Sequence, residues 1–305
     1  MVQKYGKVVV VMGGDSPERE VSLISGDAVL SALKSCGVNA HAFDPSCAPI
    51  TDLINGSFSR AVLMTHGKHG EDGILQGVLE FLRIPYTGSG VTASGIAFDK
   101  YRTKLIWQTV GLPLAKSQYV VKRGFDYQKF KLEIELPVVV KPACEGSTLG
   151  ISKVYELEQL ESAINLAFTN DNALLIEQLI TGGEYTVTIC DGEVLPFVKI
   201  VAPQDNYDYE HKYFSDDTKY ICPYDLGGLT EKIRRYALKG YEAVGARGIA
   251  RLDFMVDKND NIYFLEINTL PGMTSHSLVP TAYKAKSISF EALCLLILDS
   301  AALGG

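Results

Sequence analysis

Two apolar segments near the carboxyl end carry polar side chains two residues apart. IARLDFMV contains Arg251 and Asp253, and NIYFLEINTL contains Glu266 and Asn268. Because side chains two apart in a strand point to the same side, each pair shares one face of its strand. The turn-forming residues of DKNDN separate the two segments, so we expect an antiparallel hairpin.

The expected pairing brings these polar side chains together. A loop at residues 258–261 aligns Asp257 with Ile262, Asp253 with Glu266, and Arg251 with Asn268. A slip of one residue in either strand would move its pair to the other face. At ~4 Å, two carboxylates repel by about 4 kcal/mol at an effective dielectric near 20, and a divalent cation removes that penalty. These oxygen-bearing side chains predict a Mg²⁺ site. The alternative is an Arg251–Glu266 salt bridge in a purely structural hairpin.

Two loops have the composition of anion sites. In VVVKPACEGSTLG, Lys141 ends a strand and precedes glycines and hydroxyl residues, which suits phosphate, although an ordinary hairpin turn is equally compatible. In LPGMTSHSLVP, Gly272 gives flexible backbone, and Thr274, Ser275 or Ser277 could cap a short helix. The amino end of such a helix binds carboxylate or phosphate, but plain capping needs no ligand. The chain lacks both G-x-x-x-x-G-K-[ST] and an early G-x-G-x-x-G.

The amino-terminal third contains two further candidate loops. GGDSPERE places Pro17 in the first turn of a helix, with Ser16 or Asp15 as its cap. Glu18 is then either a surface carboxylate or the partner of an ammonium ion. THGKHGEDG carries His66 and His69. For a lone histidine in such a glycine loop, a structural role is commoner than a catalytic one. Further on, segment 204–220 is polar and aromatic, which suggests either a mobile lid or an exposed surface loop.

Alternating strands and helices must position these loops. In the first hundred residues, KVVVVMGG and AVLMTHG are predicted strands, and REVSLISGDAVLSALKSCG and EDGILQGVLEFLRI are predicted helices. This order predicts a parallel sheet with its ligand loops at the carboxyl ends of the strands. Residues 99–182 are predicted to form a helix, two strands, a helix and a strand. Residues 183–305 contain strands EYTVTIC and EVLPFVKIV, helix LTEKIRRYALKGYEAVG, the hairpin and a final helix.

Composition narrows the class of protein. The 305 residues are 47% hydrophobic and 21% charged, with a net charge of −7. That charge argues against a nucleic-acid partner or a polybasic membrane surface, and no apolar stretch reaches the length of a membrane span. The opening apolar run is too short for a secretory signal. Six scattered cysteines, without C-x-x-C, predict reduced thiols in a cytoplasmic protein. Cys144 lies in a candidate loop, but the sequence beside it offers no base for a nucleophile.

Together these motifs resemble the D-alanine–D-alanine ligase family of ATP-grasp enzymes. The resemblance rests on GGDSPEREVSLISG, HGKHGEDGILQG, YTGSGVTASGIAFDK, VVVKPACEGSTLGISKV, YDYEHKY, ARLDFM and EINTLPGMTSHSLVP, which span almost the whole chain. It implies an α/β chain of the α+β ATP-grasp type. An amino-terminal parallel-sheet domain (1–98) is followed by two ATP-grasp subdomains (99–182 and 183–305), with the nucleotide between them.

The resemblance also implies the ligands of ATP and metal. The implied metal ligands, for two Mg²⁺ or Mn²⁺ ions, are Asp253, Glu266 and Asn268. The implied ATP-contacting residues are Lys100, Lys141, Ser147, Glu177, Gln178, Leu179, Ile180, Glu184 and Lys212.

For the two substrates, the resemblance assigns separate groups. Glu18 would bind the ammonium of the first D-alanine, with His66 near its carboxylate and Ser147 and Tyr213 in a hydrogen-bonded network with Glu18. Ser277 and the N–H of Leu278 would bind the carboxylate of the second D-alanine. Arg251 and the N–H of Gly272 would stabilise the oxyanion.

The implied reaction is ATP-dependent formation of D-alanyl-D-alanine through an acyl phosphate, for peptidoglycan precursor synthesis, by a cytoplasmic homodimer. Related ligases use D-lactate or D-serine as second substrate, and Tyr213 favours alanine over D-lactate. Cys144 stands where relatives often have arginine. An inert ATP-binding protein of the same fold would have lost some of these residues. A dinucleotide-dependent dehydrogenase lacks support, because its fingerprint is missing.

Overall fold

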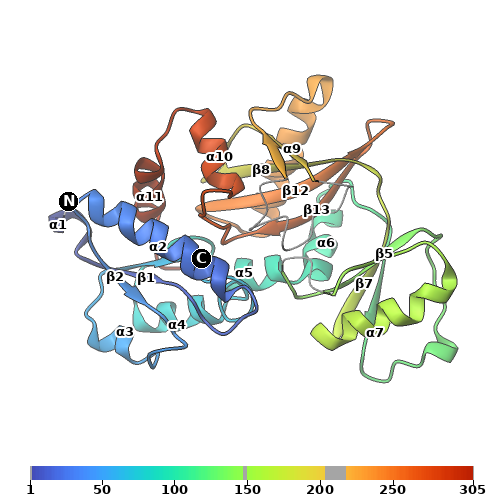
Figure 1. Ribbon diagram of the computed structural model, residues 1–305, viewed down its shortest axis with the longest axis horizontal. Coiled ribbons are helices and arrows are strands. Elements are labelled where there is room, and N and C mark those ends of the chain that lie inside the picture. The colour runs from blue at the N-terminus through green and yellow to red at the C-terminus, as the bar shows by residue number, and fades with distance from the viewer. Residues whose placement is uncertain (1, 147–149, 203–217, 305) are drawn as a thin grey trace.

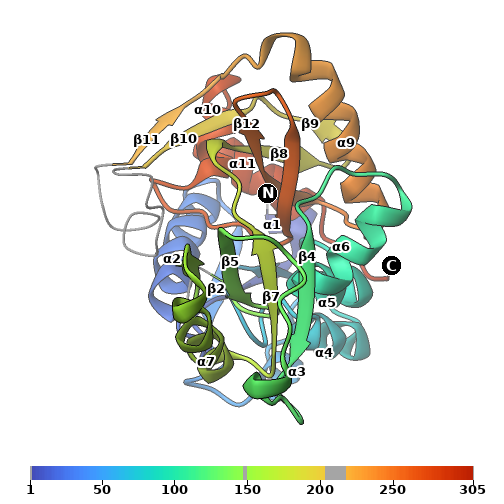
Figure 2. The same cartoon turned by 90° about the vertical axis from the view of Figure 1, so that its right-hand side faces the viewer.

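The structure is a computed structural model that describes residues 2–146, 150–202 and 218–304. Figure 1 shows three sheets: one near the amino terminus, a second at the far end, and a third above and between them. Figure 2, turned by 90°, shows the second sheet below the central strands of the third.

The first sheet is parallel, with strand order β2-β1-β3. Its strands are β1 (Lys7–Val11), β2 (Asn39–Phe43) and β3 (Arg60–Leu63), and its helices are α1 (Val2–Tyr5), α2 (Arg19–Ser35), α3 (Asp52–Asn55) and α4 (Ile74–Leu82). Val8 and Val10 lie in one apolar core, and Val9 and Val11 lie in another. Because β1 is buried on both faces, its sequence is a continuous apolar run. The predicted parallel sheet is confirmed, and β2 is a strand that the predicted alternation did not include.

The second sheet is antiparallel, with strand order β4-β7-β5-β6. Its strands are β4 (Ser117–Val121), β5 (Val138–Pro142), β6 (Ser152–Val154) and β7 (Ala173–Gln178). Two helices, α5 (Val91–Phe98) and α6 (Lys100–Thr109), precede it, and α7 (Leu160–Asn170) packs against β5, β6 and β7. The side chains between α7 and the sheet form a core of their own, which includes Val138, Val140, Ile164 and Ile176.

The third sheet has the order β11-β10-β8-β12-β13, with β9 paired to β8. Its strands are β8 (Gly182–Cys190), β9 (Glu193–Val194), β10 (Val198–Val201), β11 (Lys219–Ile221), β12 (Ile249–Asp257) and β13 (Ile262–Asn268). Helix α9 (Thr230–Ala243) covers one part of it, and α10 (Leu278–Ala285) and α11 (Phe290–Asp299) follow the hairpin. Short 3-10 turns lie at Tyr127–Lys129, Leu157–Gln159 and Gly227–Leu229.

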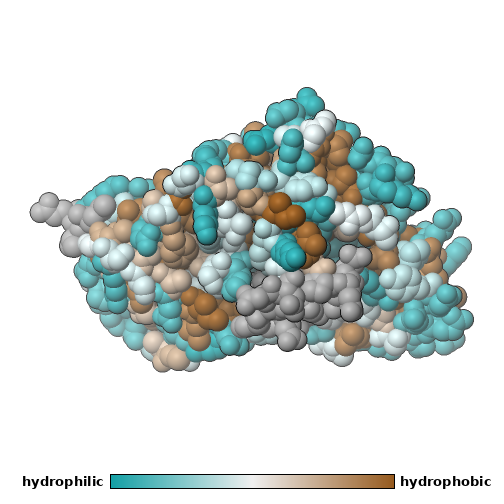
Figure 3. All heavy atoms as spheres, turned by 45° about the horizontal axis from the view of Figure 1, so that its top comes forward, coloured by the Kyte–Doolittle hydropathy of each residue, from teal (hydrophilic) through white to brown (hydrophobic). Residues whose placement is uncertain are grey.

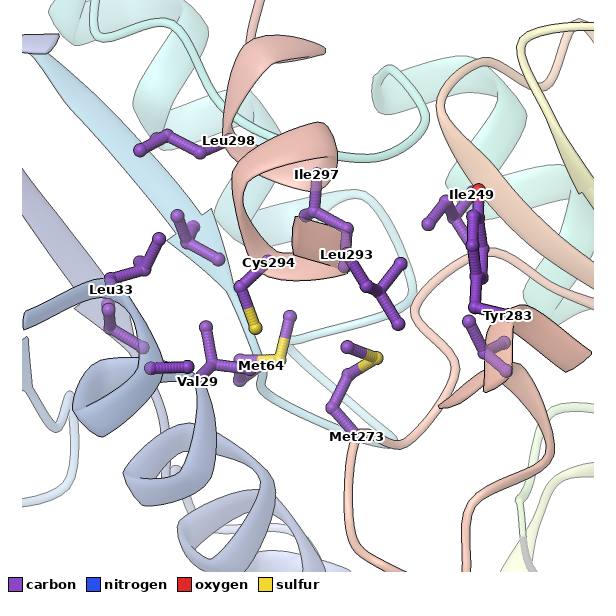
Figure 4. Close-up of a cluster of buried hydrophobic side chains, with 14 of the residues drawn as sticks. Val29, Leu33, Met64, Ile249, Met273, Tyr283, Leu293, Cys294, Ile297 and Leu298 are labelled. Atoms are coloured by element: carbon purple, nitrogen blue, oxygen red, sulfur yellow. The ribbon is translucent and has the colours of Figure 1, made fainter. Parts of the chain in front are cut away.

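The last helix packs on the first sheet. Helix α11 contacts α2 and β3, and Figure 4 shows the shared core, with these residues labelled: Val29, Leu33, Met64, Ile249, Met273, Tyr283, Leu293, Cys294, Ile297 and Leu298. At the edge, the Nζ of Lys4 lies 2.7 Å from Oδ1 of Asp299. The two ends of the chain therefore share one hydrophobic core.

The β12–β13 hairpin has the predicted polar pairs and one unpredicted irregularity. Asp253 lies opposite Glu266 and Arg251 opposite Asn268, as expected. Nearer the turn, Val256 pairs with Ile262, so the expected pairing of Asp257 with Ile262 is wrong by one residue. A β-bulge after Asp253, with Leu265 as the extra residue, restores the register.

The start of α2 also differs from the expectation. The helix begins at Arg19, with Glu18 at the N-cap position, so Pro17 precedes the helix. Neither predicted cap, Ser16 or Asp15, is at the N-cap position. Ser16 instead donates its hydroxyl to the carbonyl of His66 (2.7 Å) and accepts from the N–H of Glu18 (3.2 Å). Ser16 therefore ties the Glu18 turn to the loop that follows β3.

The surface agrees with the composition. Figure 3 shows mainly hydrophilic side chains on this face, interrupted by small hydrophobic patches. Among the helices of the described residues, none has the length and apolar character needed to cross a membrane. All six cysteines are described and have free thiols.

Candidate active site

One cavity gathers residues from all three parts of the chain. It is lined by Glu18, Glu71, Ala97, Phe98, Lys100, Glu145, Gly146, Arg251, Glu266, Ile267, Asn268 and Thr269. Glu18 comes from the turn before α2, Lys100 from the start of α6, and Arg251 and Glu266 from the hairpin. The cavity is therefore lined by carboxylates and cations that come from different elements.

The hairpin wall contains a tight ion pair. Arg251 donates from Nε and Nη2 to the two carboxylate oxygens of Asp253, both at 2.9 Å. Glu266 lies opposite Asp253, and its Oε2 is 3.4 Å from the Nζ of Lys100. The amide oxygen of Asn268 accepts from the N–H of Leu270 at 2.9 Å. The four polar residues predicted to share this wall are all partnered by hydrogen bonds or charges.

Helix α6 supplies the cations on the second wall. Asp99 caps the helix by accepting from the N–H of Arg102 (2.9 Å), which fixes its first turn. Lys100 donates its Nζ to the carbonyl of Glu145 at 2.6 Å. Burial lowers the pKa of Lys100, but the charge and hydrogen bond of Glu266 outweigh burial and raise the pKa above its usual value. Lys100 therefore stays protonated inside the cavity wall.

A buried ion cluster lies at the end of β7, one helical turn along α6. The Oε1 of Glu177 is 2.9 Å from the Nζ of Lys104, and its Oε2 is 2.8 Å from the Nζ of Lys141. Burial raises the pKa of Glu177, but the two lysines outweigh it and hold the pKa below the usual range. The carboxylate is therefore ionised, with one lysine on each oxygen.

The residues after Glu177 connect the second and third sheets. Gln178 donates its N–H to the carbonyl of Lys116 (2.9 Å), and Leu179 donates to that of Pro137 (3.0 Å). Ile180 leads into β8, where Glu184 pairs with Met255 of β12. This connector is the stretch for which the resemblance implies contacts to adenine and ribose.

The carboxylate of Glu18 lies against the backbone of Gly146. A Cβ added at Gly146 would lie 2.4 Å from Oε2 of Glu18, closer than real contacts allow. The Glu18 side chain is buried, with 6% of the residue exposed. The carboxylate therefore reaches into the same space as the loop after β5.

His66 lies behind Glu18, at the carboxyl end of β3. Its Nδ1 is 3.2 Å from Oε1 of Glu71, and its Nε2 is buried without a hydrogen-bond partner among the described residues. Burial lowers the pKa of His66, but the hydrogen bond and charge of Glu71, with the charge of Glu18, raise it above the usual value. The backbone of Leu270 also helps to raise the pKa of the imidazole, which places the loop before α10 beside the ring.

The loop before α10 approaches the same histidine. A Cβ added at Gly272 would lie 3.0 Å from the Oγ of Ser277 and 3.9 Å from the Nε2 of His66. Ser277 is the N-cap residue of α10, whose first residue is Leu278, and its Oγ accepts from the N–H of Thr274 at 2.9 Å. Of the three candidate caps, Ser277 therefore occupies the N-cap position, but its hydroxyl makes no capping hydrogen bond to the helix.

Some predicted residues lie outside the described part of the chain. Ser147, Lys212 and Tyr213 belong to this group, as does most of the predicted lid at 204–220. Of that segment, Thr218, Lys219 and Tyr220 are described, and the last two belong to β11.

Three residues at the site escaped prediction. Lys104 contacts Glu177, Glu71 contacts His66, and Glu145 accepts from Lys100 and pairs with Lys68. The sequence could have indicated Lys104, because it follows Lys100 by four residues and therefore lies on the same face of the helix.

The hairpin carries donors that suit a hard cation. Within the described residues, no cluster of three or more His, Cys, Asp and Glu side chains is placed to hold a metal. Asp253 and Glu266 nevertheless face each other, with the amide of Asn268 two residues on. Mg²⁺ is commonly held by one or two carboxylates, completed by water and substrate phosphates, so this oxygen set fits Mg²⁺ or Mn²⁺.

Cys144 is not activated as a nucleophile. Burial, with the charges of Asp99 and Asp171, raises the pKa of its thiol to about 12. Its N–H donates to the carboxylate of Asp171 at 2.7 Å. The thiol is therefore protonated at neutral pH.

A parallel sheet followed by two antiparallel sheets, with lysines and facing carboxylates between them, defines an ATP-grasp enzyme. Residues 106–299 match the family model described as D-ala D-ala ligase C-terminus. The chain is 47% identical over 305 residues to the D-alanine–D-alanine ligase of Laribacter hongkongensis, covering 100% of this chain and 99% of that protein. It is also 47% identical over 304 residues to D-alanine–D-alanine ligase B of Chromobacterium violaceum, covering 99% and 100%.

Solved structures agree. The D-alanine–D-alanine ligase of Bacillus anthracis matches with a TM-score of 0.83 at 33% identity, over 96% of both chains. A crystal structure of that enzyme complexed with ATP matches with a TM-score of 0.84 at 32% identity, again over 96% of both. The chain therefore belongs to the D-alanine–D-alanine ligase family.

Proposed function

We propose that this protein joins two D-alanine molecules into D-alanyl-D-alanine, at the expense of ATP, for peptidoglycan precursor synthesis. The observation that carries the proposal is the single cavity that gathers Glu18, Lys100, Arg251, Glu266 and Asn268 from three parts of the chain. A cavity lined by residues from different parts of the chain suits a reaction that brings several substrates together. D-Lactate or D-serine as second substrate, or inert ATP binding, is not favoured by relatives that match over the full chain.

The cations and the hairpin wall suit phosphoryl transfer. A carboxylate oxygen is a poor leaving group, so ATP must first convert the first D-alanine to an acyl phosphate. Lys100 and Lys141, with Lys212, bind the nucleotide phosphates, while the connector from Glu177 to Glu184 receives adenine and ribose. Asp253, Glu266 and Asn268 would hold two Mg²⁺ or Mn²⁺ ions, which neutralise charge on the transferring phosphoryl group.

The buried carboxylate of Glu18 suits the first substrate. Glu18 binds its ammonium ion, with Ser147 and Tyr213 as hydrogen-bonding neighbours, and His66 lies near its carboxylate. The raised pKa of His66 supports this role, because a protonated imidazole attracts an anion.

The loop before α10 suits the second substrate. Ser277 and the N–H of Leu278 bind its carboxylate at the amino end of the helix. When its amine attacks the acyl phosphate, Arg251 and the N–H of Gly272 stabilise the tetrahedral oxyanion. A Cβ built at Gly272 would lie near both Ser277 and His66, which supports a common site for both substrates.

A mass-spectrometric end-point assay with Mg-ATP tests the proposal. The protein is incubated separately with D-alanine, with L-alanine, and with D-alanine plus D-lactate. We expect D-alanyl-D-alanine with matched ADP release, from the D-isomer alone. Folded protein that binds ATP but forms no dipeptide would overturn the proposal, and a depsipeptide as main product would point to the lactate-using alternative.

A matched pair of variants ties this activity to the cavity. Glu18 is buried in the cavity, whereas Glu20 is exposed on the first turn of α2. We expect Glu18→Gln to abolish dipeptide formation and Glu20→Gln to retain it.

Further features of the assembly are proposed from the family resemblance. They are a division into 1–98, 99–182 and 183–305, a homodimer, and a cytoplasmic location without nucleic-acid or membrane partners. Sedimentation velocity tests the dimer, since a species of twice the chain's 33.3 kDa is expected.

A further inference from the structure

Lys104 is a buried cation that the proposed reaction does not use. Its side chain is 2% exposed, as is that of Glu177, and its Nζ lies 2.9 Å from Oε1 of Glu177. The same Nζ lies 3.5 Å from the carbonyl of Phe264 on β13. Because Glu177 belongs to β7, Lys104 joins the second and third sheets from the side of α6.

The cluster contains one more cation than it needs for neutrality. Lys141 contacts the second oxygen of Glu177, at 2.8 Å. Burial, helped by the nearby charge of Lys141, lowers the pKa of Lys104, whereas Glu177 opposes that shift. Glu177 is thus shared by two cations that repel each other.

The sharing has a consequence for Lys141. A buried carboxylate whose only partner leaves is strongly destabilised, so a lone Lys141 would be held on Glu177. With Lys104 on the other oxygen, Glu177 keeps a counter-ion when the ammonium of Lys141 turns to an anionic phosphate. The repulsion from Lys104 also favours that turn.

We propose that Lys104 is a positioning residue that releases Lys141 for ATP by serving as the permanent counter-ion of Glu177. The inference rests on the proposed function, because it takes Lys141 as a phosphate-binding lysine. Lys104 itself touches neither nucleotide nor substrate in this scheme, and it acts through Glu177.

The first test measures ATP affinity by isothermal titration calorimetry with Mg²⁺, without D-alanine. We expect Lys104→Met to weaken ATP binding about tenfold, the scale of losses when a supporting residue behind a ligand contact is removed. Lys104→Arg keeps the charge and should stay within about threefold of the parent protein. Thr103→Val is the control, because Thr103 is equally buried on α6 but bonds to the carbonyl of Ile96. Unchanged affinity in Lys104→Met overturns the inference.

A double variant separates this role from packing. In Glu177→Gln, Lys141 is no longer held by a carboxylate, so the further change Lys104→Met should weaken ATP binding less than it does in the parent protein. If the two losses simply add, Lys104 does not act through Glu177 and the inference is wrong. The double variant also serves if Lys104→Met alone does not fold, since it removes the buried carboxylate that Lys104→Met would leave with a single counter-ion, Lys141. Its affinity should then match that of Glu177→Gln, and a further tenfold loss overturns the inference.

The outcomes remain distinct from those of the proposed function. ATP binding is measured without the ligase reaction, so a protein that forms no dipeptide can still show the Lys104 effect. Conversely, an active ligase whose Lys104→Met variant binds ATP normally would retain the proposed function and lose this inference.

Discussion

The guanidinium of Arg251 binds both carboxylate oxygens of Asp253, through Nε and Nη2, each at 2.9 Å. One partner is the proposed oxyanion stabiliser and the other a proposed metal ligand. Bidentate pairs of this kind fix both groups in orientation. A cation bound at Asp253 would compete with Arg251 for the same carboxylate oxygens.

Replacement of Arg251 should therefore impair the chemical step more than nucleotide binding. We expect Arg251→Met to lower kcat about 100- to 1000-fold, the range for loss of one oxyanion donor, with ATP affinity changed less than threefold. Steady-state kinetics and calorimetry measure the two effects. Arg235→Met, at an exposed position on α9, is the control. A variant with normal kcat would remove Arg251 from the proposed chemistry.

Glu266 should govern the dependence on divalent cations. The change Glu266→Gln removes the charge that faces Asp253 and Lys100, so we expect at least about a 100-fold loss of kcat and a higher Mg²⁺ concentration at half-activity. Titration of activity with Mg²⁺ and Mn²⁺ measures both. The exposed Glu242 on α9 provides the matched Glu→Gln control. An unshifted metal titration would exclude Glu266 as a ligand.

The His66–Glu71 pair should make part of the stability depend on pH. The folded pKa of His66 lies above its usual 6.5, so the pair's contribution is fully present below about pH 6.5 and is lost as pH rises through the raised pKa. In Glu71→Gln, burial dominates and the pKa of His66 should fall. NMR titration of the imidazole measures the shift, with Glu20→Gln as control. A pKa that does not move would mean that Glu71 is not the cause.

Two leucines on α11 provide a matched test of the shared core. Leu298 is 0% exposed and Leu296 is 44% exposed. We expect Leu298→Ala to lower the free energy of unfolding by about 2–5 kcal/mol, whereas Leu296→Ala should change it by less than about 0.5 kcal/mol. Urea unfolding followed by circular dichroism distinguishes them. Equal losses would contradict the packing of α11 on α2.

Regular periodicity made much of the fold predictable. The buried strand Lys7–Val11, helix α2 and the hairpin all have apolar patterns that single out one structure. Strand β2 has no such pattern, because its sequence NAHAF is mostly exposed. β2 is held by its pairing with β1, and a local sequence pattern does not predict such a long-range contact.

The site was predictable where a polar residue interrupts an apolar strand, and less so elsewhere. Asp253 and Glu266 stand out because burying a charge in a strand is costly. The bulge at Leu265 gives no sequence signal, yet it is needed for the predicted pair to meet. Lys104 resembles any helical surface lysine, and only the structure shows that Glu177 and Phe264 surround it.

The shared core of α2, β3, α10 and α11 sets a condition on the order of folding during synthesis. Chains emerge from the ribosome amino end first, at about 5–20 residues per second. Val29, Leu33 and Met64 must then wait, uncovered, for Leu293, Cys294 and Ile297, which lie far later in the sequence. The core beside the first sheet is therefore completed only after α11 has been made, and a chain interrupted before α11 exposes an apolar surface that is prone to aggregate.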